Sequence, residues 1–258
     1  MAGARVAEAQ HVRIDRVWPD PADDLDDDAL TAELRRADPM LRVNFVSSVD
    51  GAATRDGLSG GLGDAADRRY FELLRRAADV VVVGAGTVRA EGYGPLRVAE
   101  ESAAWRAAHG LPPHPVFAIV SGALDLDPDS RIFVEAPVPP IVVTTEGHDT
   151  RAFAERAEVV EAGRGGRIDA AAAVAALHAR GLTRILCEGG PHLFGALLAA
   201  DVVDELCVTV APSLEAGDAR RIAAGELPEP RRLELVHVLR SGSTLLLRYR
   251  RDAEPSAT

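Results

Sequence analysis

Several features that mark large classes of proteins are scarce in this chain of 258 residues. Aromatic residues make up only 4% of it, so platforms that stack nucleic acid bases are not expected. The formal net charge is -11, whereas a nucleic acid groove needs a concentration of positive charge. The composition therefore argues against nucleic acid as a partner. It leaves room for a small phosphorylated molecule, because local basic residues decide that.

Long apolar runs are also missing. No run reaches the roughly 20 residues that a transmembrane helix needs. The N-terminal stretch, MAGARVAEAQHVRID, has no long apolar segment of the kind found in a secretory signal. The sequence therefore predicts a cytoplasmic protein without a membrane partner.

Cysteine is nearly absent. The two cysteines, Cys187 and Cys207, each lie in an apolar run that resembles a strand, so we expect core thiols in a reducing compartment. They are far apart in the sequence and no close histidine pair accompanies them, so no metal site is expected. A zinc deaminase is excluded, because its His-x-Glu and Pro-Cys-x-x-Cys motifs are absent.

The apolar content, 47%, is enough for a full core, and its pattern alternates between strands and helices. Continuous apolar strands between helices indicate a mostly parallel sheet covered on both faces. Residues 233–251 predict a hairpin around Ser241, which adds antiparallel edge strands. The predicted strands lie at 41–48, 80–84, 116–121, 140–145, 159–163, 184–190 and 204–212, and the predicted helices at 28–37, 64–79, 102–109, 150–157, 169–181 and 192–203.

An acidic run precedes the first predicted helix. Residues 20–28, DPADDLDDD, hold six aspartates. A calcium loop would need a glycine at its turn and a distal glutamate in register, and neither is present. We expect a solvated acidic face that opens the helix near Asp28.

A glycine pair separates a strand from a helix in CEGGPHLFG, residues 187–195. Glycines have no Cβ, so the backbone can approach a phosphate, and the N–H groups and dipole of the helix start favour an anion. The pattern is neither a Rossmann fingerprint nor a Walker loop. The alternative is a plain strand-to-helix turn with Pro191 in the first helical turn.

Two further strand ends carry similar signals. VGAGTVRAEGYGPLR, residues 83–97, opens a buried strand into a glycine-rich turn with Thr87, and NFVSSVDGAAT, residues 44–54, ends in a turn at Asp50. Ligands of open α/β sheets gather at such strand ends. An ordinary capped turn and an ordinary Asp-Gly turn are the respective alternatives.

Together, VSSVDG, LLRRAADVVVVGAGTVRAE and ILCEGGPHLFGALLAADVVDELCVTVAP resemble the C-terminal reductase domain of the bacterial riboflavin-biosynthesis deaminase-reductase. The resemblance runs from about Leu41 to Tyr249. It implies a dihydrofolate-reductase-like α/β fold, with a mostly parallel central sheet flanked by helices and a C-terminal antiparallel hairpin. The implied division is an N-terminal extension at 1–40, a reductase domain at 41–251 and a tail at 252–258.

The resemblance also implies a function. It is that of a homodimeric, NADPH-dependent oxidoreductase of riboflavin biosynthesis. The substrate would be 2,5-diamino-6-ribosylamino-4(3H)-pyrimidinone 5′-phosphate or its deaminated form, whose ribosyl group is opened and reduced to ribityl. Hydride would come from the nicotinamide, and the protein would orient it.

The resemblance assigns residues to three roles. Leu62 lies near the place where the family often has a tryptophan, Glu91 stands where it usually has aspartate, and Leu96 and Arg97 are shifted by the inserted Tyr93. The implied catalytic residues are Asp50 and Glu188. The implied substrate-binding residues are Ser59, Arg75, Leu96 and Arg97. The implied cofactor-binding residues are Ser47, Leu62, Thr87, Glu91, Ser121, Gly189, Gly190, Pro191, His192, Leu193, Phe194, Gly195 and Ala196.

Chemistry supports these roles, with alternatives. Arg75 and Arg97 offer planar forks for a phosphate monoester, although Arg75 could instead form a helix-surface pair with Glu72 or Asp79. His192 could donate to a phosphate oxygen or simply start the helix. The other histidines form no constellation and are expected at the surface.

Two other functions remain open at this point. The same fold could reduce dihydrofolate or another pterin-like ring, because both substrates carry an aminopyrimidinone edge that a carboxylate can recognise. A non-catalytic NADPH-binding protein is the other alternative, but its glycine turns would be expected to be broken. A Rossmann dehydrogenase is excluded by the absence of its fingerprint.

Overall fold

The computed structural model describes residues 12–35, 39–227 and 229–252. Its main sheet has ten strands in the order β1-β11-β12-β10-β2-β9-β3-β4-β5-β6. The strands from β10 to β6 in this order are parallel, and β1, β11 and β12 are antiparallel to their neighbours. The strands are β1 (Asp15–Trp18), β2 (Met40–Ser48), β3 (Val80–Gly84), β4 (Val116–Val120), β5 (Ile141–Thr144), β6 (Glu158–Glu161), β9 (Arg184–Cys187), β10 (Glu205–Ala211), β11 (Leu233–Ser241) and β12 (Thr244–Arg251), and a separate hairpin holds β7 (Gly163–Arg164) and β8 (Arg167–Ile168).

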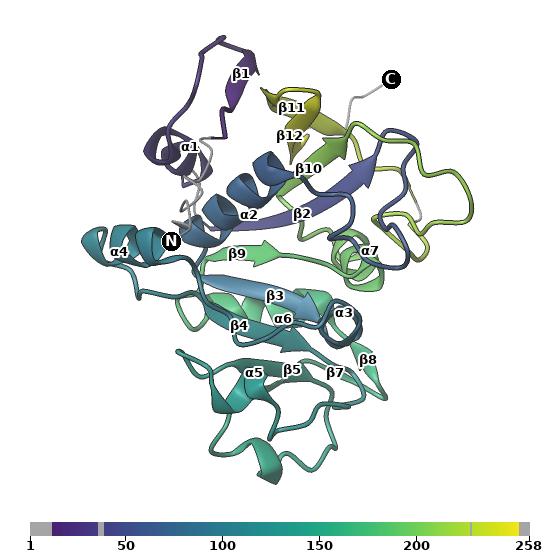
Figure 1. Ribbon diagram of the computed structural model, residues 1–258. Coiled ribbons are helices and arrows are strands. Elements are labelled where there is room, and N and C mark those ends of the chain that lie inside the picture. The colour runs from purple at the N-terminus through teal and green to yellow at the C-terminus, as the bar shows by residue number, and fades with distance from the viewer. Residues whose placement is uncertain (1–11, 36–38, 228, 253–258) are drawn as a thin grey trace, which may run out of the picture.

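Helices cover both faces of this sheet (Figure 1). One buried cluster joins α1 and α2 to one face, and a second cluster joins α6 and α7 to the other. The predicted mostly parallel sheet between helices is therefore confirmed. The helices are α1 (Asp27–Leu34), α2 (Ala65–Ala77), α3 (Ala85–Ala90), α4 (Glu100–Ala108), α5 (Arg131–Val134), α6 (Ala170–His178) and α7 (Pro191–Ala199), with a 3-10 helix η1 (Arg151–Phe153).

Local sequence signals place the helix starts. The Asp64 carboxylate accepts hydrogen bonds from the Ala66 and Asp67 N–H groups at the start of α2. Asp169 accepts from the Ala172 N–H at the start of α6. Because these side chains satisfy free amides of the first turn, both predicted N-caps are confirmed.

The prediction was wrong at two places. The helix expected over 150–157 is only η1, a single 3-10 turn. The C-terminal hairpin does not form the edge of the sheet, because β1 pairs with β11 beyond it. The four residues of β1, DRVW, are too short and too mixed in polarity to carry a periodic signal, and only the pairing with β11 makes them a strand.

The acidic run is not only a solvated face. The Asp27 carboxylate accepts a hydrogen bond of 2.8 Å from Arg69 of α2, and Asp28 pairs with Arg76. Asp26 caps α1 by accepting from the Ala29 N–H. The start of α1 is therefore attached to α2 by ion pairs.

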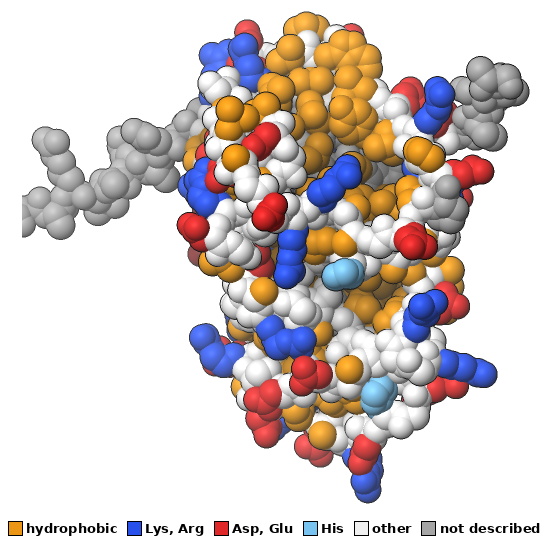
Figure 2. Space-filling model, turned by 90° about the vertical axis from the view of Figure 1, so that its right-hand side faces the viewer, with side chains coloured by type: hydrophobic (Ala, Val, Ile, Leu, Met, Phe, Trp, Pro, Cys, Tyr) orange, Lys and Arg blue, Asp and Glu red, His pale blue; other side chains and the backbone are white. Residues whose placement is uncertain are grey.

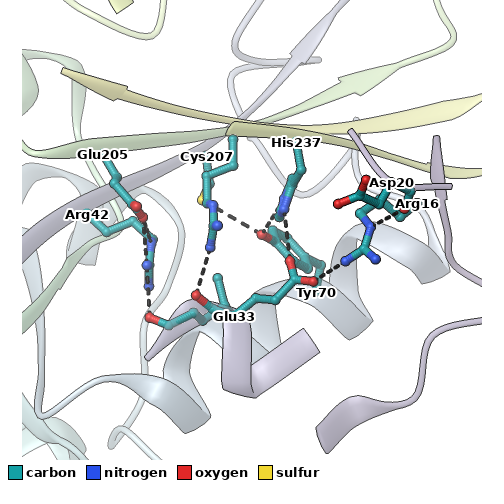
Figure 3. Close-up of polar contacts among 10 residues, drawn as sticks. Arg16, Asp20, Glu33, Arg42, Tyr70, Glu205, Cys207 and His237 are labelled. Carbon is teal, nitrogen blue, oxygen red and sulfur yellow. Dashed lines mark hydrogen bonds and ion pairs between the residues drawn. The ribbon is translucent and has the colours of Figure 1, made fainter. Parts of the chain in front are cut away.

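The prediction that the other histidines lie at the surface is wrong for His237. His237 is 2% exposed, although it was expected at the surface. Its ring nitrogens lie 3.2 Å from Glu33 Oε2 and 3.3 Å from the Tyr70 hydroxyl, between the sheet and the helices (Figure 3). Burial lowers the pKa of His237 in spite of the opposing effect of Glu33. The network joins α1 to β11, a long-range contact that no local pattern announces.

Both cysteines are free and buried, as expected for core thiols. Burial raises the pKa of Cys187 to about 12, so this thiol stays protonated. Within the described ranges, none of the helices has the length and apolarity to cross a membrane.

Candidate active site

A cavity opens at the carboxyl ends of the parallel strands, where α/β sheets hold their ligands. Its wall is built from the end of β2, the loop 53–63, one side of α2, the start of α3 and the turn after β9. An adjoining hollow shares Ser59, Phe71, Glu91 and Tyr93 with it and continues along α2. The three strand ends singled out in the sequence therefore converge on one region.

The structure brings together nine of the predicted site residues. Six line the main cavity, and three more line only the adjoining hollow. They are Ser59, Thr87, Glu91, Glu188, Gly190 and Pro191 in the cavity, and Arg75, Leu96 and Arg97 in the hollow.

The two glycine-rich turns pack directly on each other. The Gly84 N–H donates to the Gly189 carbonyl at 2.9 Å. A Cβ at Gly190 would lie 2.4 Å from the Thr87 Oγ1, and Gly189 has φ +101° with a Cβ position 3.1 Å from Phe45. No side chain caps the start of α7 at Gly190. Both glycines are needed for this approach, and the result is an uncovered helix start beside the Thr87 hydroxyl.

A buried ion pair forms the floor between the two hollows. Arg75 donates two hydrogen bonds to Glu188, from Nε to Oε1 at 2.6 Å and from Nη2 to Oε2 at 2.7 Å. The Glu188 side chain is 1% exposed and that of Arg75 is 16% exposed. The Tyr93 hydroxyl also donates to Glu188 Oε2, at 3.1 Å. Glu188 is therefore fixed in place by two groups from distant segments.

Arg75 does not pair with the partners that a local reading suggested. The Glu72 carboxylate accepts from the Ala99 N–H, and Asp79 accepts from the Arg184 N–H. Burial lowers the pKa of Arg75, but the charge and hydrogen bonds of Glu188 outweigh it and leave that pKa raised. The Arg75 guanidinium also lies over the Phe71 ring, 4.4 Å from its centroid.

Asp50 turns toward the loop after β10. Its carboxylate accepts from the Ser48 hydroxyl and from the N–H groups of Glu215 and Ala216. These hydrogen bonds, led by that of Ser48, lower its pKa to about 2. Asp50 does not line either described hollow. It is an ionised anchor for the loop in this structure.

The other predicted residues line neither the cavity nor the adjoining hollow. The Ser47 hydroxyl donates to the Ser48 carbonyl, and Leu62 is buried beneath its loop. Ser121 is buried at the end of β4, where its carbonyl accepts from the Thr144 hydroxyl. His192 is exposed on the first turn of α7. The rest of this segment consists of Gly189, Leu193, Phe194, Gly195 and Ala196, which belong to the turn and to α7.

Several residues that line the cavity were not among the predicted site residues, and four of them carry large or polar side chains from α2 or from the segment after α3. Tyr93 was seen only as an insertion, yet it bonds to Glu188. Asp67, Arg68 and Phe71 all project from α2 into the wall. A signal for two of them was present, because Asp67, Phe71 and Arg75 are spaced by four residues and share one side of a helix.

The sequence of residues 39–247 matches the model of the RibD C-terminal domain family. A relative from Methanothermobacter thermautotrophicus, the 2,5-diamino-6-ribosylamino-4(3H)-pyrimidinone 5′-phosphate reductase, is 32% identical over 82% of this chain and 97% of its own length. The reductase of the same name from Archaeoglobus fulgidus is 25% identical over 83% and 99%.

A solved structure has the same fold. The crystal structure of a pyrimidine reductase-like protein from Corynebacterium diphtheriae superposes with a TM-score of 0.74 at 29% identity, covering 84% of this chain and 93% of that one. The predicted α/β fold, with a mostly parallel central sheet flanked by helices and a C-terminal antiparallel hairpin, is thereby confirmed.

Proposed function

The chain belongs to the RibD C-terminal domain family, and from this premise we propose that it is a pyrimidine reductase of riboflavin biosynthesis. Its substrate is 2,5-diamino-6-ribosylamino-4(3H)-pyrimidinone 5′-phosphate or the deaminated form, and its reductant is NADPH. The observation that carries the proposal is the convergence of the glycine turns and the Arg75–Glu188 pair on one cavity and its adjoining hollow.

The cradle formed by Gly189 and Gly190 fits a dinucleotide. A Cβ at Gly189 would contact Phe45, and a Cβ at Gly190 would contact Thr87. No side chain caps the start of α7, so its backbone N–H groups are available to a ligand in the cavity. In our proposal the diphosphate lies against residues 190–196, with the Thr87 hydroxyl beside it. When bound, the reduced nicotinamide supplies a hydride, and the protein orients the acceptor carbon toward it.

The substrate occupies the side of the cavity nearer α2. Glu188 accepts hydrogen bonds from the amino groups of the pyrimidine. Arg75 and Tyr93 hold its carboxylate in one orientation, so the acceptor is in place before the substrate binds. The phosphate lies in the adjoining hollow, which is lined by Arg75 and Arg97. Asp50 accepts hydrogen bonds from Glu215 and Ala216 and so holds the loop 213–216 in place. Its pKa of about 2 makes it a poor proton donor, so its role is to support this loop.

The test is NADPH consumption by the purified protein with the ribosylaminopyrimidine phosphate and with dihydrofolate, side by side. We expect turnover of the first substrate alone. Turnover of dihydrofolate with little of the first would mean that this fold has been redirected to a pterin. NADPH binding without either reaction would support a non-catalytic protein and contradict the proposal.

We also propose that the protein is a homodimer, and an apolar sheet face supports this. One row crosses the sheet from β10 to β1 through directly paired residues: Val208, Leu247, Val238 and Trp18. Trp18 is 44% exposed. Figure 2 shows a broad hydrophobic area at the end of the molecule where Figure 1 places β11 and β12. A flat apolar face without charges in its central row suits a second copy of itself.

Light scattering tests this assembly. We expect the wild-type protein to have the mass of two chains and Leu247→Asp to have the mass of one, because a carboxylate in a packed apolar interface loses its hydration. Val134→Asp is the matched control, since Val134 is exposed on α5 away from this row. A monomeric wild-type protein, or a dimeric Leu247→Asp variant that is folded, would contradict the proposal.

A further inference from the structure

Three carboxylates line the cavity, and they differ in their partners. Glu188 is held by Arg75 and Tyr93, and Glu91 accepts from the Ser59 N–H at 2.9 Å. Asp67 makes no ion pair and accepts no backbone hydrogen bond within the residues that the structure describes. Among the described residues it is therefore the cavity carboxylate with the fewest contacts that hold its side chain in place.

The position of Asp67 is constrained on several sides. It lies in the first turn of α2, where its N–H is bound by the Asp64 carboxylate. A Cβ at Gly63 would lie 2.2 Å from Asp67 Oδ2, so the glycine makes space for this carboxyl group. On the sheet side it lies near the Thr209 hydroxyl of β10.

The surroundings of Asp67 raise its pKa above the ordinary value of an aspartate. Burial raises its pKa, and the charge of Asp64 acts in the same direction. The Thr209 hydroxyl and the charge of Arg68 oppose this without reversing it. A carboxyl group with a raised pKa in a cleft is a common arrangement for proton transfer.

The proposed reaction needs such a group. A ribosylamine opens when its C1′–O4′ bond breaks, and this gives a C1′=N imine with a free hydroxyl on C4′. Reduction adds a hydride to C1′ and a proton to the nitrogen, so each turnover consumes one proton besides the two electrons from NADPH. This proton must come from a side chain or from water.

We propose that Asp67 donates this proton, an inference that rests on the proposed function. As C1′ receives the hydride, the nitrogen forms a new N–H bond with the Asp67 proton, and the π electrons of C1′=N become the N–H bonding pair. Asp67 is left as a carboxylate and regains a proton from solvent. Glu188 and Glu91 act instead as fixed acceptors for the pyrimidine and the loop.

The test compares Asp67→Asn with the wild-type enzyme over a range of pH. We expect kcat to fall by about 100-fold or more, as when a general acid is removed, with the dissociation constant of NADPH changed less than about twofold. In the wild-type enzyme kcat/KM should fall as the pH rises past the pKa of Asp67, because only the protonated form donates. This descending limb should be absent in Asp67→Asn.

Asp64→Asn is the matched control, because asparagine also caps a helix. Removing its charge should lower the pKa of Asp67 and move the descending limb to lower pH. The Asp67 carboxyl resonance in the cofactor-free protein should titrate with the same shift, which gives a reading independent of activity.

The possible failures are distinguishable. If the wild-type enzyme turns over the pyrimidine and Asp67→Asn keeps its rate and pH profile, only the proton donor is overturned. Equal loss of kcat and NADPH affinity would also overturn it, since that pattern indicates a structural role. If the wild-type protein binds NADPH and reduces no ribosylaminopyrimidine, the proposed function fails and the proton donor fails with it.

Discussion

Replacing Gly190 with aspartate is expected to abolish NADPH binding, with an affinity loss of at least about 100-fold. The residue caps α7 without a side chain, and its backbone lines the cavity. A carboxylate here would compete for the amides of the helix start and repel the diphosphate. Fluorescence titration of NADPH measures the loss, and circular dichroism checks that the variant is folded.

The steric effect of a side chain at position 190 has to be distinguished from the effect of its charge. A Cβ at position 190 would lie 2.4 Å from Thr87 Oγ1 but 3.8 Å from Thr87 Cβ, so Thr87→Ala removes the clash. In that background Gly190→Asp and Gly190→Asn have the same size and differ in charge. We expect the aspartate variant to bind NADPH at least about tenfold more weakly, with the difference shrinking at high salt.

Equal binding by these two variants would contradict the phosphate assignment, because a charge beside a diphosphate cannot be neutral in effect. The Thr87→Ala protein alone is the reference for both. If the aspartate and asparagine variants both bind as well as this reference, the glycine serves only the packing of the two turns. If the Thr87→Ala protein and both of its position-190 variants unfold, the variant Thr87→Ala with Gly190→Ala replaces them. It is the smallest change that still adds a Cβ at position 190.

The sequence predicted the framework of this site better than its contacts. Apolar runs and capping aspartates located the parallel strands and main helices, because these signals are local. The meeting of Gly84 and Gly189 follows from the rule that parallel strands end at one edge of the sheet. That rule predicts that the two turns lie close together, but it does not predict which of their atoms are in contact.

Long-range polar contacts were the part that the sequence could not supply. Arg75 and Glu188 are separated by 113 positions, and local spacing favoured Glu72 or Asp79 instead. His237 is likewise buried by α1, which reaches it only in the folded chain. Such pairs depend on tertiary geometry, and neither propensity nor periodicity encodes a specific partner.

The Arg75–Glu188 pair gives the second large expected effect. In Glu188→Gln the guanidinium of Arg75 stays buried without its counter-charge, and we expect the free energy of unfolding to fall by about 3 kcal/mol or more. Turnover should fall at least about 100-fold, because the pyrimidine loses a charged acceptor. Tyr93→Phe is a milder comparison, since it removes one hydrogen bond and should cost about 1 kcal/mol.

A double variant separates stability from activity at this pair. Replacing both Arg75 and Glu188 with methionine removes both charges, and such a change in a buried pair is often neutral or stabilising. We expect urea unfolding to show recovery of most of the stability lost in Glu188→Gln, while turnover stays below detection. Recovery of activity together with stability would contradict a role for Glu188 in substrate binding. A stable and inactive double variant would mean that the ion pair is retained for the reaction rather than for the fold.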